Sequence, residues 1–235
     1  MRICAIVQAR LGSTRLKNKV LLPLCGKPML WHIIERVKRA ALVDEVVVAY
    51  PSMDSAELKP IVMDAGAKNC PYDEDENDLV GRYLWAAKMF QADLIVRICA
   101  DNPCVQPEYI DEAVQLWRTY PLAFYSNTTV GVQGRWMDGL GAEVFSRHRL
   151  QWLDMNTAGV ADYREHPHRL FYDQAERHPE WFGFPVSAPV LRLDVNTEAD
   201  YEFITDIYEH IYPTHPQFTI EDVLAYLKTK EVSHA

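Results

Sequence analysis

A short apolar segment near the start of the chain, Ile3 to Val7, most constrains the possible fold. Its residues favour a buried strand, a polar loop follows, and Pro28 to Ala41 then carries apolar residues at helical spacing. The same order recurs where the strand pattern Glu45 to Ala49 is followed by the helix pattern Ser55 to Ala65. Strands that alternate with helices are typical of a mostly parallel central sheet flanked by helices. The sequence therefore predicts an α/β fold.

The alternation continues along the chain without an internal repeat, a low-complexity segment or a domain linker. We therefore expect residues 1–235 to form a single domain. The later strand patterns are Leu94 to Ile98, Ala123 to Ser126, a short segment that ends at Phe145, and Val190 to Val195. The later helix patterns are Leu79 to Phe90, Pro107 to Tyr120, Arg147 to Met155, Ala161 to His168, a helix opened by Asn196 to Asp200, and Thr219 to Lys228.

The composition excludes several classes of protein. The formal net charge of −9 argues against general nucleic-acid binding, which needs spread positive charge. Five cysteines, an odd number without CxxC spacing, argue against a disulfide framework or a structural zinc site and fit a reducing cytosol. No signal peptide precedes the first strand pattern, and no apolar stretch is long enough to span a membrane. We expect a soluble cytoplasmic protein without nucleic-acid or membrane partners.

The loop that follows the first strand pattern is strongly cationic for such an acidic chain. It carries one glycine, two hydroxyl groups and four positive side chains: Arg10, Arg15, Lys17 and Lys19. Backbone N–H groups and hydroxyls at such a position can donate to phosphate oxygens, while arginine and lysine neutralise them. We interpret the loop as a cradle for a nucleoside triphosphate, and the alternative is a basic surface turn. A dinucleotide dehydrogenase is disfavoured because no GxGxxG follows the strand.

Several carboxylates near the ends of predicted elements are further candidates. Asp101 follows a buried strand at the place where ligands of open α/β sheets bind, which suits a metal ligand. The alternative is a turn aspartate before Asn-Pro. In the acidic run that begins at Asp73, we interpret the residues up to Glu76 as a solvated loop. Asp78 and Arg82 share one face of the next helix start and are expected to face the site.

The connection from Asn127 to Gly141 is long and contains four glycines. Loops of this length in a compact domain are usually functional or disordered. Asp138 and Glu143 border this connection, so both are candidates for ligand binding.

An opening motif and five further segments, in order along nearly the whole chain, resemble those of the cytidylyltransferases. The opening motif is Ile6 to Arg10 with Ser13 to Leu16, Lys19, and Gly26 to Leu30. The further matches are Glu76 to Tyr83, Ile95 through Asp101 to Pro103, Asp138 through Phe145, Arg164 to His166, and Leu191 through Asp200. The chain is similar in particular to the branch for spore-coat polysaccharide biosynthesis, and to CMP-Kdo and CMP-sialate synthetases.

This resemblance implies a GT-A-like (Rossmann-like) nucleotidyltransferase fold, often as a homodimer. It also implies the reaction, in which CTP and an acidic sugar give the CMP-sugar and pyrophosphate with Mg²⁺ as cofactor, in surface polysaccharide biosynthesis. The partners would be CTP and an anionic small-molecule acceptor. Residues 127–190 would then form a lobe for acceptor binding and dimerisation.

The resemblance also assigns roles to individual residues. The catalytic residues it implies are Arg10, Arg15, Lys19 and Asp101. The nucleotide-binding residues it implies are Ala9, Arg10, Leu11, Gly12, Ser13, Lys19, Asp78 and Arg82, with backbone N–H groups from Leu11 to Thr14 on the phosphates. The acceptor-binding residues it implies are Asp138, Glu143, Arg164 and His166.

The sequence departs from the pattern of the family at the metal site. Asp101 matches a magnesium-binding aspartate, but the second carboxylate normally lies in a Val-Asp-Thr segment, where this chain has Asn196. Asp194 lies two residues earlier and would face the same side of an extended strand. Either Asp194 supplies the lost charge, or the metal is held by Asp101 and the amide oxygen of Asn196. Lys17 also departs from the pattern, because relatives commonly have proline there.

Three hypotheses for the function follow. The leading one is CMP transfer to a Kdo-like or nonulosonate-like sugar acid. A second is a cytidylyltransferase with a phosphate or phosphonate acceptor, whose extra phosphate would be bound by Arg135, Arg164 or Arg169. A third is a catalytically impaired nucleotide-binding partner, which the replacement at Asn196 motivates. His168 is interpreted as a structural residue.

Overall fold

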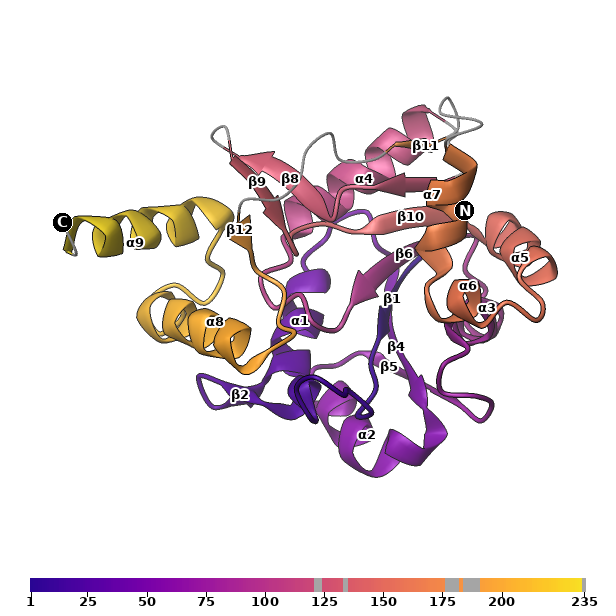
Figure 1. Cartoon of the computed structure of the whole chain (residues 1–235), viewed down its shortest axis with the longest axis horizontal. Coiled ribbons are helices and arrows are strands. Elements are labelled where there is room, and N and C mark those ends of the chain that lie inside the picture. Colours follow the sequence, from indigo (N-terminus) through magenta and orange to yellow (C-terminus); the bar gives the residue numbers. More distant parts are fainter. Residues whose placement is uncertain (121–123, 133–134, 176–181, 184–190, 234–235) are drawn as a thin grey trace.

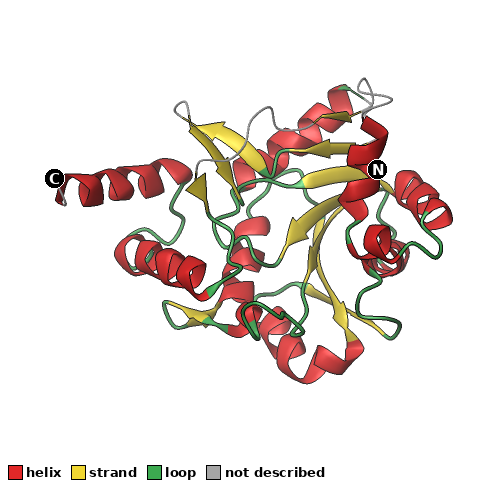
Figure 2. Ribbon diagram, in the orientation of Figure 1, coloured by secondary structure: helices red, strands yellow, loops and turns green. Residues whose placement is uncertain are grey.

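The computed structural model describes residues 1–120, 124–132, 135–175, 182–183 and 191–233. They form a central seven-stranded sheet with helices packed on both faces (Figures 1 and 2). The strand order is β11-β7-β10-β6-β1-β4-β5. In chain order the strands of this sheet are β1 (Ile3–Gln8), β4 (Glu45–Pro51), β5 (Lys68–Tyr72), β6 (Leu94–Cys99), β7 (Phe124–Ser126), β10 (Glu143–Ser146) and β11 (Phe182–Gly183).

The direction of the strands follows from the helices that connect them. β6, β1, β4 and β5 are parallel neighbours, whereas β10 pairs antiparallel with both β6 and β7. Helices α1 (Met29–Val37), α2 (Ser55–Asp64) and α3 (Leu79–Met89) lie between successive parallel strands along the chain. The predicted α/β fold with a mostly parallel sheet flanked by helices is confirmed.

The central strand β1 is buried on both faces, which explains its continuous apolar run. Ala5 and Val7 belong to a core that α1, α4 and α8 cover, while Cys4 and Ile6 belong to a second core under α3, α5 and α7. The bounds of these further helices are α4 (Pro107–Thr119), α5 (Arg147–Asn156), α7 (Pro167–Ala175) and α8 (Glu198–Ile211).

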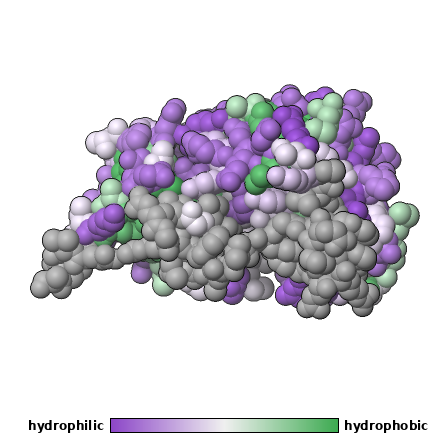
Figure 3. All heavy atoms as spheres, turned by 90° about the horizontal axis from the view of Figure 1, so that it is seen from above, coloured by the Kyte–Doolittle hydropathy of each residue, from purple (hydrophilic) through white to green (hydrophobic). Residues whose placement is uncertain are grey.

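Smaller elements complete the described structure. Two short sheets are β2–β3 and β12-β9-β8. No helix in the described ranges has the length and apolar composition that crossing a bilayer requires. The face drawn in Figure 3 is mainly hydrophilic over its described residues. The bounds are η1 (Lys19–Leu21), β2 (Pro23–Leu24), β3 (Lys27–Pro28), η2 (Ser52–Asp54), β8 (Thr129–Val132), β9 (Arg135–Asp138), α6 (Ala161–Glu165), β12 (Leu191–Arg192) and α9 (Ile220–Ser233).

The structure differs from the sequence prediction in several places. β5 was not predicted, because its run of Lys, Asn, Cys and Pro lacks a strand pattern; Pro71 is accommodated because β5 lies at the edge of the sheet. The long connection predicted between Asn127 and Gly141 instead contains the antiparallel pair β8–β9. The predicted helix from Ala161 to His168 is two helices that meet at Pro167.

The segment before α8 is held firmly against the end of β6. The Val195 N–H donates to the Asp101 carbonyl oxygen at 2.8 Å. A capping box then starts α8, in which the Asp200 carboxylate accepts from the N–H groups of Asn196 at 2.9 Å and Thr197 at 2.8 Å. The backbone of Asn196 is therefore fixed beside the loop that follows β1.

Replacing Asp200 with alanine tests this anchor. The N–H groups of Asn196 and Thr197 lose their acceptor, so we expect the free energy of unfolding to fall by about 1 kcal/mol, the usual cost of a lost cap. Urea denaturation measures the change. The matched variant Glu202→Ala changes an exposed acid of the same helix and should stay within about 0.5 kcal/mol of the original protein. Equal losses in both variants would contradict the anchoring role.

Candidate functional site

A polar cavity lies at the carboxyl ends of β1 and β6 and is bounded by α6 and by the segment before α8. Both strands end side by side in the sheet, with Gln8 opposite Cys99. The loops that follow them therefore meet at one edge, as open α/β sheets require of a ligand site. The predicted site residues that line the cavity are Arg10, Ser13, Arg15, Lys19, Asp101, His166 and Asn196.

Lys19 connects three segments at the centre of this cavity. Its Nζ donates to Asp101 Oδ2 at 2.9 Å, to the Val195 carbonyl oxygen at 2.9 Å and to Asn196 Oδ1 at 3.2 Å. Asn18, in the left-handed region with φ 53°, turns the chain so that Lys19 begins η1. The loop after β1 is thus fastened to the turn after β6 and to the start of α8.

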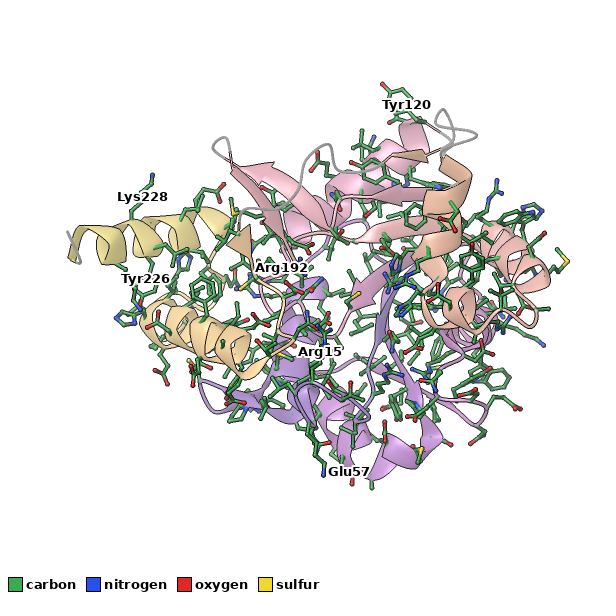
Figure 4. All side chains as sticks on the ribbon, viewed as in Figure 1. Arg15, Glu57, Tyr120, Arg192, Tyr226 and Lys228 are labelled. Atoms are coloured by element: carbon green, nitrogen blue, oxygen red, sulfur yellow. The ribbon has the colours of Figure 1, made fainter. Side chains whose placement is uncertain are left out.

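The two arginines of the loop reach different walls of the cavity. Arg15, labelled in Figure 4, donates to Asn196 Oδ1 at 2.7 Å, and Lys19 Nζ contacts the same oxygen at 3.2 Å. Arg10 donates to Asn77 Oδ1 at 2.7 Å and to Glu165 Oε1 at 3.0 Å. An anion that enters the cavity must therefore compete with protein oxygens for both guanidinium groups.

The backbone of the loop is held by an aspartate that the sequence analysis missed. The Leu11 N–H donates to Asp54 Oδ2 at 2.9 Å, and the carboxylate of Asp54 is largely buried. The Ala9 N–H also has a protein acceptor, the Ala49 carbonyl oxygen at 3.1 Å. Within the described ranges, the N–H groups of Gly12 and Thr14 donate to no protein acceptor. These two groups, rather than Leu11 N–H, are free to bind an anion.

The acidic run approaches the loop more closely than expected. Asp73 is exposed, as the predicted solvated loop requires, but the Glu76 carboxylate lies beside Gly12. A Cβ atom on Gly12 would lie 3.0 Å from Glu76 Oε2. A side chain at this position would displace the flexible end of Glu76, and Gly12 does not adopt a left-handed backbone angle.

Arg82 is completely buried, although no carboxylate pairs with it in the described structure. Its Nη2 donates to the Glu76 carbonyl oxygen, while Nε and Nη1 have no hydrogen-bond partner. Burial lowers the pKa of Arg82, and the nearby charge of Arg10 acts in the same direction. A buried guanidinium with two unpaired donors is costly unless a ligand supplies acceptors.

Asp78 and Arg164 bind each other. Arg164 donates from Nε and Nη2 to the two oxygens of Asp78 at 2.8 and 2.7 Å, and its Nη1 donates to Asp154 Oδ1 at 2.6 Å. Asp78 also caps α3 through the Gly81 N–H. The sequence analysis gave these residues separate roles toward nucleotide and acceptor; the structure places both beside a neighbouring pocket, engaged with each other.

Glu143 and Arg97 form a buried ion pair across β10 and β6. They are directly opposite in the antiparallel register, and Arg97 Nη1 donates to Glu143 Oε2 at 2.5 Å. Arg97 lines the cavity, and its Nε has no partner. The sequence signal for Arg97 was a charged residue inside an otherwise apolar strand. His168 packs nearby, where burial lowers its pKa to about 4, which fits its predicted structural role.

Asp138 and Asp194 share one arginine, Arg192. Arg192 donates from Nε and Nη2 to the two oxygens of Asp194 at 3.0 and 2.8 Å, and its Nη2 lies 3.3 Å from Asp138 Oδ2. Asn196 Nδ2 donates to Asp194 Oδ2 at 2.5 Å. Both oxygens of Asp194 are therefore occupied, whereas Asn196 Oδ1 faces Lys19 and Arg15.

Two oxygen ligands for a hard cation converge at Lys19 Nζ, one from Asp101 and one from Asn196. Carboxylate and amide oxygens are ligands that Mg²⁺ accepts, with phosphate oxygens completing the set. The described residues contain no group of three or more His, Cys, Asp or Glu side chains that could hold a metal by themselves. The donor set thus fits a cation that arrives with a polyphosphate.

Comparison with known proteins finds related sequences and structures. Residues 4–222 match the family model described as cytidylyltransferase. The chain is 38% identical over 114 residues to the 3-deoxy-manno-octulosonate cytidylyltransferase of Geobacter sulfurreducens, and the match covers 48% of this chain and 44% of that enzyme. The aligned part thus spans less than half the length of that relative.

Two solved structures share the fold. A cytidylyltransferase from Leptospira borgpetersenii superposes with a TM-score of 0.85 at 26% identity, over 99% of this chain and 96% of that one. A CMP:2-keto-3-deoxy-manno-octonic acid synthetase, solved in complex with CTP, superposes with a TM-score of 0.67 at 21% identity, over 89% of this chain and 99% of that one.

The Asp78–Arg164 pair predicts a pH-dependent stability. Burial alone would raise the pKa of Asp78, but hydrogen bonds from Arg164 and the Gly81 N–H outweigh it and lower the pKa below the ordinary value of 3.8. The stabilisation is therefore present above that value and is lost as the pH falls through the lower pKa of the folded state.

In urea denaturation, Asp78→Asn should lower the free energy of unfolding by about 1–3 kcal/mol at pH 7. The difference from the original protein should shrink as the pH falls below about 4. Asp73→Asn, which changes an exposed acid of the same run, is the control. A constant difference at all pH values would show that the charge of Asp78 is not what stabilises the pair.

Proposed function

The chain belongs to the cytidylyltransferase family, and we propose that it transfers CMP from CTP to an acidic sugar of the Kdo or nonulosonate type, releasing pyrophosphate. One observation carries the proposal: Lys19 and Arg15 meet the oxygens of Asp101 and Asn196 in one cavity at the carboxyl ends of β1 and β6. Such a centre combines cations for phosphate oxygens with oxygen ligands for a metal ion.

The transfer itself demands positioning and charge neutralisation. Attack of an acceptor oxygen on the α-phosphorus needs in-line geometry and a stabilised pyrophosphate leaving group. Arg10, Arg15 and Lys19 would neutralise the β- and γ-phosphates, and the free N–H groups of Gly12 and Thr14 would donate to them. Ser13, which lines the cavity, would add its hydroxyl.

Arg82 would recognise the cytosine base. Its Nε and Nη1 are buried donors without acceptors. Cytosine presents two acceptors, O2 and N3, whereas uracil carries an N–H at N3 and would leave a donor facing a donor. Asp78, engaged by Arg164, would act by fixing the start of the helix that carries Arg82.

Mg²⁺ would be held by Asp101 and Asn196, together with phosphate oxygens of the nucleotide. When bound, the ion supplies further positive charge at the phosphates. We favour Asn196 over Asp194 as the second ligand, since Arg192 occupies both oxygens of Asp194. Lys19, whose Nζ contacts the oxygens of Asp101 and Asn196, would bind a phosphate oxygen of the nucleotide.

The acceptor would occupy the part of the cavity beside Arg97 and His166. The unpaired Nε of Arg97 suits a sugar carboxylate, and Glu143 fixes its guanidinium. Asp138 would act at a distance, through its contact with Arg192. The acceptor assignments for Glu143, Arg164 and Asp138 are thus proposed as positioning roles.

The hypothesis of a phosphate or phosphonate acceptor has less support, because the arginines predicted to bind its phosphate are not free in the described structure or lie outside it. Arg164 is engaged by Asp78 and Asp154, and Arg169 is exposed and donates to Asp162. The side chain of Arg135 lies outside the described residues.

Four further properties remain predictions: membership of the spore-coat branch, a surface polysaccharide pathway, a cytoplasmic location, and a homodimer formed by residues 127–190. Part of the lobe formed by residues 127–190 lies outside the described residues.

The proposal is tested by pyrophosphate release from CTP and Mg²⁺ with a panel of acceptors. Release with an acidic sugar supports it, while release only with a phosphorylated acceptor would support the second hypothesis. CTP binding without turnover on any acceptor would favour a catalytically impaired partner.

The role of Lys19 gives a sharper prediction. Lys19→Ala should lower the rate of pyrophosphate release by about 100-fold or more, since a preorganised charge at the phosphates is lost. Lys17→Ala removes an exposed cation of the same loop and serves as the matched control, with near-original activity. Equal activities of the two variants would refute the assignment.

Asn196→Asp tests the metal ligand. A second carboxylate should lower the Mg²⁺ concentration that gives half-maximal activity severalfold, because cation affinity rises with ligand charge. Titration of activity with Mg²⁺ measures the effect. Glu198→Gln, an exposed position two residues later, is the control. An unchanged Mg²⁺ requirement in Asn196→Asp would exclude Asn196 from the metal site.

A further inference from the structure

A second pocket lies away from the cavity just described, between α1 and the turn that follows α8. It shares no lining residue with the first cavity. Figure 1 shows α1 and α8 side by side on the same side of the central sheet. The residues of this pocket that matter here are Trp31, His32, Glu35, Arg36, Arg39 and Tyr212.

Arg36 is the buried cation of this pocket, with only 3% of its surface exposed. Its Nε donates to the Tyr208 hydroxyl at 3.3 Å, and its Nη1 donates to the Phe218 carbonyl at 3.1 Å. The guanidinium also lies 3.9 Å from the centre of the Phe218 ring. Its Nη2 is buried without an acceptor, and no carboxylate forms an ion pair with Arg36 among the described residues.

Arg39 lies in the turn that follows α1, and its N–H donates to the Arg36 carbonyl oxygen at 3.1 Å. It also lines the pocket, is half-buried, and makes no ion pair within the described ranges. Burial lowers the pKa of Arg39, and the charge of Arg36 lowers it further. The one acid that lines the pocket, Glu35, already accepts from Lys38 at 2.7 Å. Neither guanidinium group therefore makes an ion pair among the described residues, although Glu108 and Glu35 act on Arg39 at longer range.

The other polar groups of the pocket, which include His32, Tyr212 and Gln217, supply both donors and acceptors. The His32 ring is held at the Leu24 carbonyl by a hydrogen bond of 2.7 Å through Nε2, so Nε2 is the donor. Burial lowers the pKa of His32 to about 4, so the ring is neutral at pH 7. The free ring nitrogen of His32, Nδ1, is therefore an acceptor, and it is the positive charge of Arg36 and Arg39 that calls for an anionic ligand.

We propose that this pocket binds a phosphate group through Arg36 and Arg39. A dianion balances both guanidinium charges, and its tetrahedral oxygens can accept from several donors at once. A carboxylate carries half that charge and fewer acceptor directions. The phosphate is either free in solution or borne by an organic molecule whose apolar part contacts the aromatic rings of Trp31 and Tyr212.

Isothermal titration with inorganic phosphate tests the site. The full chain carries Lys19→Ala, so that phosphate binding in the first cavity is weakened. Arg39→Gln added to this chain should raise the dissociation constant for phosphate about tenfold, the effect of one lost charged hydrogen bond. Arg118→Gln removes the same charge from an exposed position on α4 and should leave the constant unchanged. Absence of phosphate binding, or equal affinities in the two variants, would overturn the proposal.

Further variants and ligands distinguish the possible explanations. Arg39→Lys keeps the positive charge but loses the planar guanidinium group, so we expect an affinity for phosphate between those of the chains with Arg39 and with Arg39→Gln. If Arg39→Gln lowers the melting temperature of the protein, Arg39→Lys takes its place in the test. Acetate that binds as tightly as phosphate would overturn the requirement for a dianion. Tighter binding of phenyl phosphate than of inorganic phosphate identifies an organic phosphate as the ligand, and the reverse order identifies free phosphate.

The outcome is independent of the proposed cytidylyl transfer. Arg39→Gln alone, with Lys19 intact, should release pyrophosphate from CTP at the original rate in phosphate-free buffer, because the two pockets share no residue. Loss of phosphate binding with intact turnover therefore supports the second site.

Discussion

The ammonium group of Lys19 connects the segments that form the cavity at the carboxyl ends of β1 and β6. Lys19 binds oxygens from the turn after β6 and from the segment before α8, and these segments are joined again by the Val195–Asp101 backbone hydrogen bond. The three segments are far apart in sequence, and the order of β1 and β6 in the sheet brings two of them to one edge. The capping box of α8 then keeps Asn196 at the same point. Much of the geometry of the cavity depends on this one side chain.

The cavity is built from cations that already have oxygen partners. Arg10 binds Glu165, Arg15 binds Asn196, and Lys19 binds Asp101. Buried or half-buried charges require such partners, because an unpaired charge loses its hydration without compensation. The exceptions within the described ranges are informative. The Nε of Arg97, which lines the cavity, is an unpaired donor, and the buried Arg82, which is not among the lining residues, has two.

The sequence predicted the parts of the fold that depend on local pattern. Apolar periodicity predicted the parallel strands other than β5, and the loop from Arg10 to Lys19 led to the prediction of a phosphate cradle. It did not reveal Asp54, which contacts Leu11 from 43 residues away. Nor did it reveal the pairing of Asp78 with Arg164, 86 residues apart, or of Arg97 with Glu143. Such contacts depend on register and topology, which residue spacing does not specify. β5 was missed because an edge strand tolerates proline.

The engagement of the cavity's cations by protein oxygens has a consequence for how a ligand would be selected. The lining still carries more positive side chains (Arg10, Arg15, Lys19 and Arg97) than carboxylates (Asp101 and Glu165), so an approaching triphosphate would be attracted before contact. Binding becomes an exchange, in which each phosphate oxygen replaces a protein oxygen at Arg10, Arg15 or Lys19. The gain then comes from how closely the incoming oxygens match the positions of those they displace. Charge would draw anions to the cavity, and the fit of their oxygens at contact would discriminate among them.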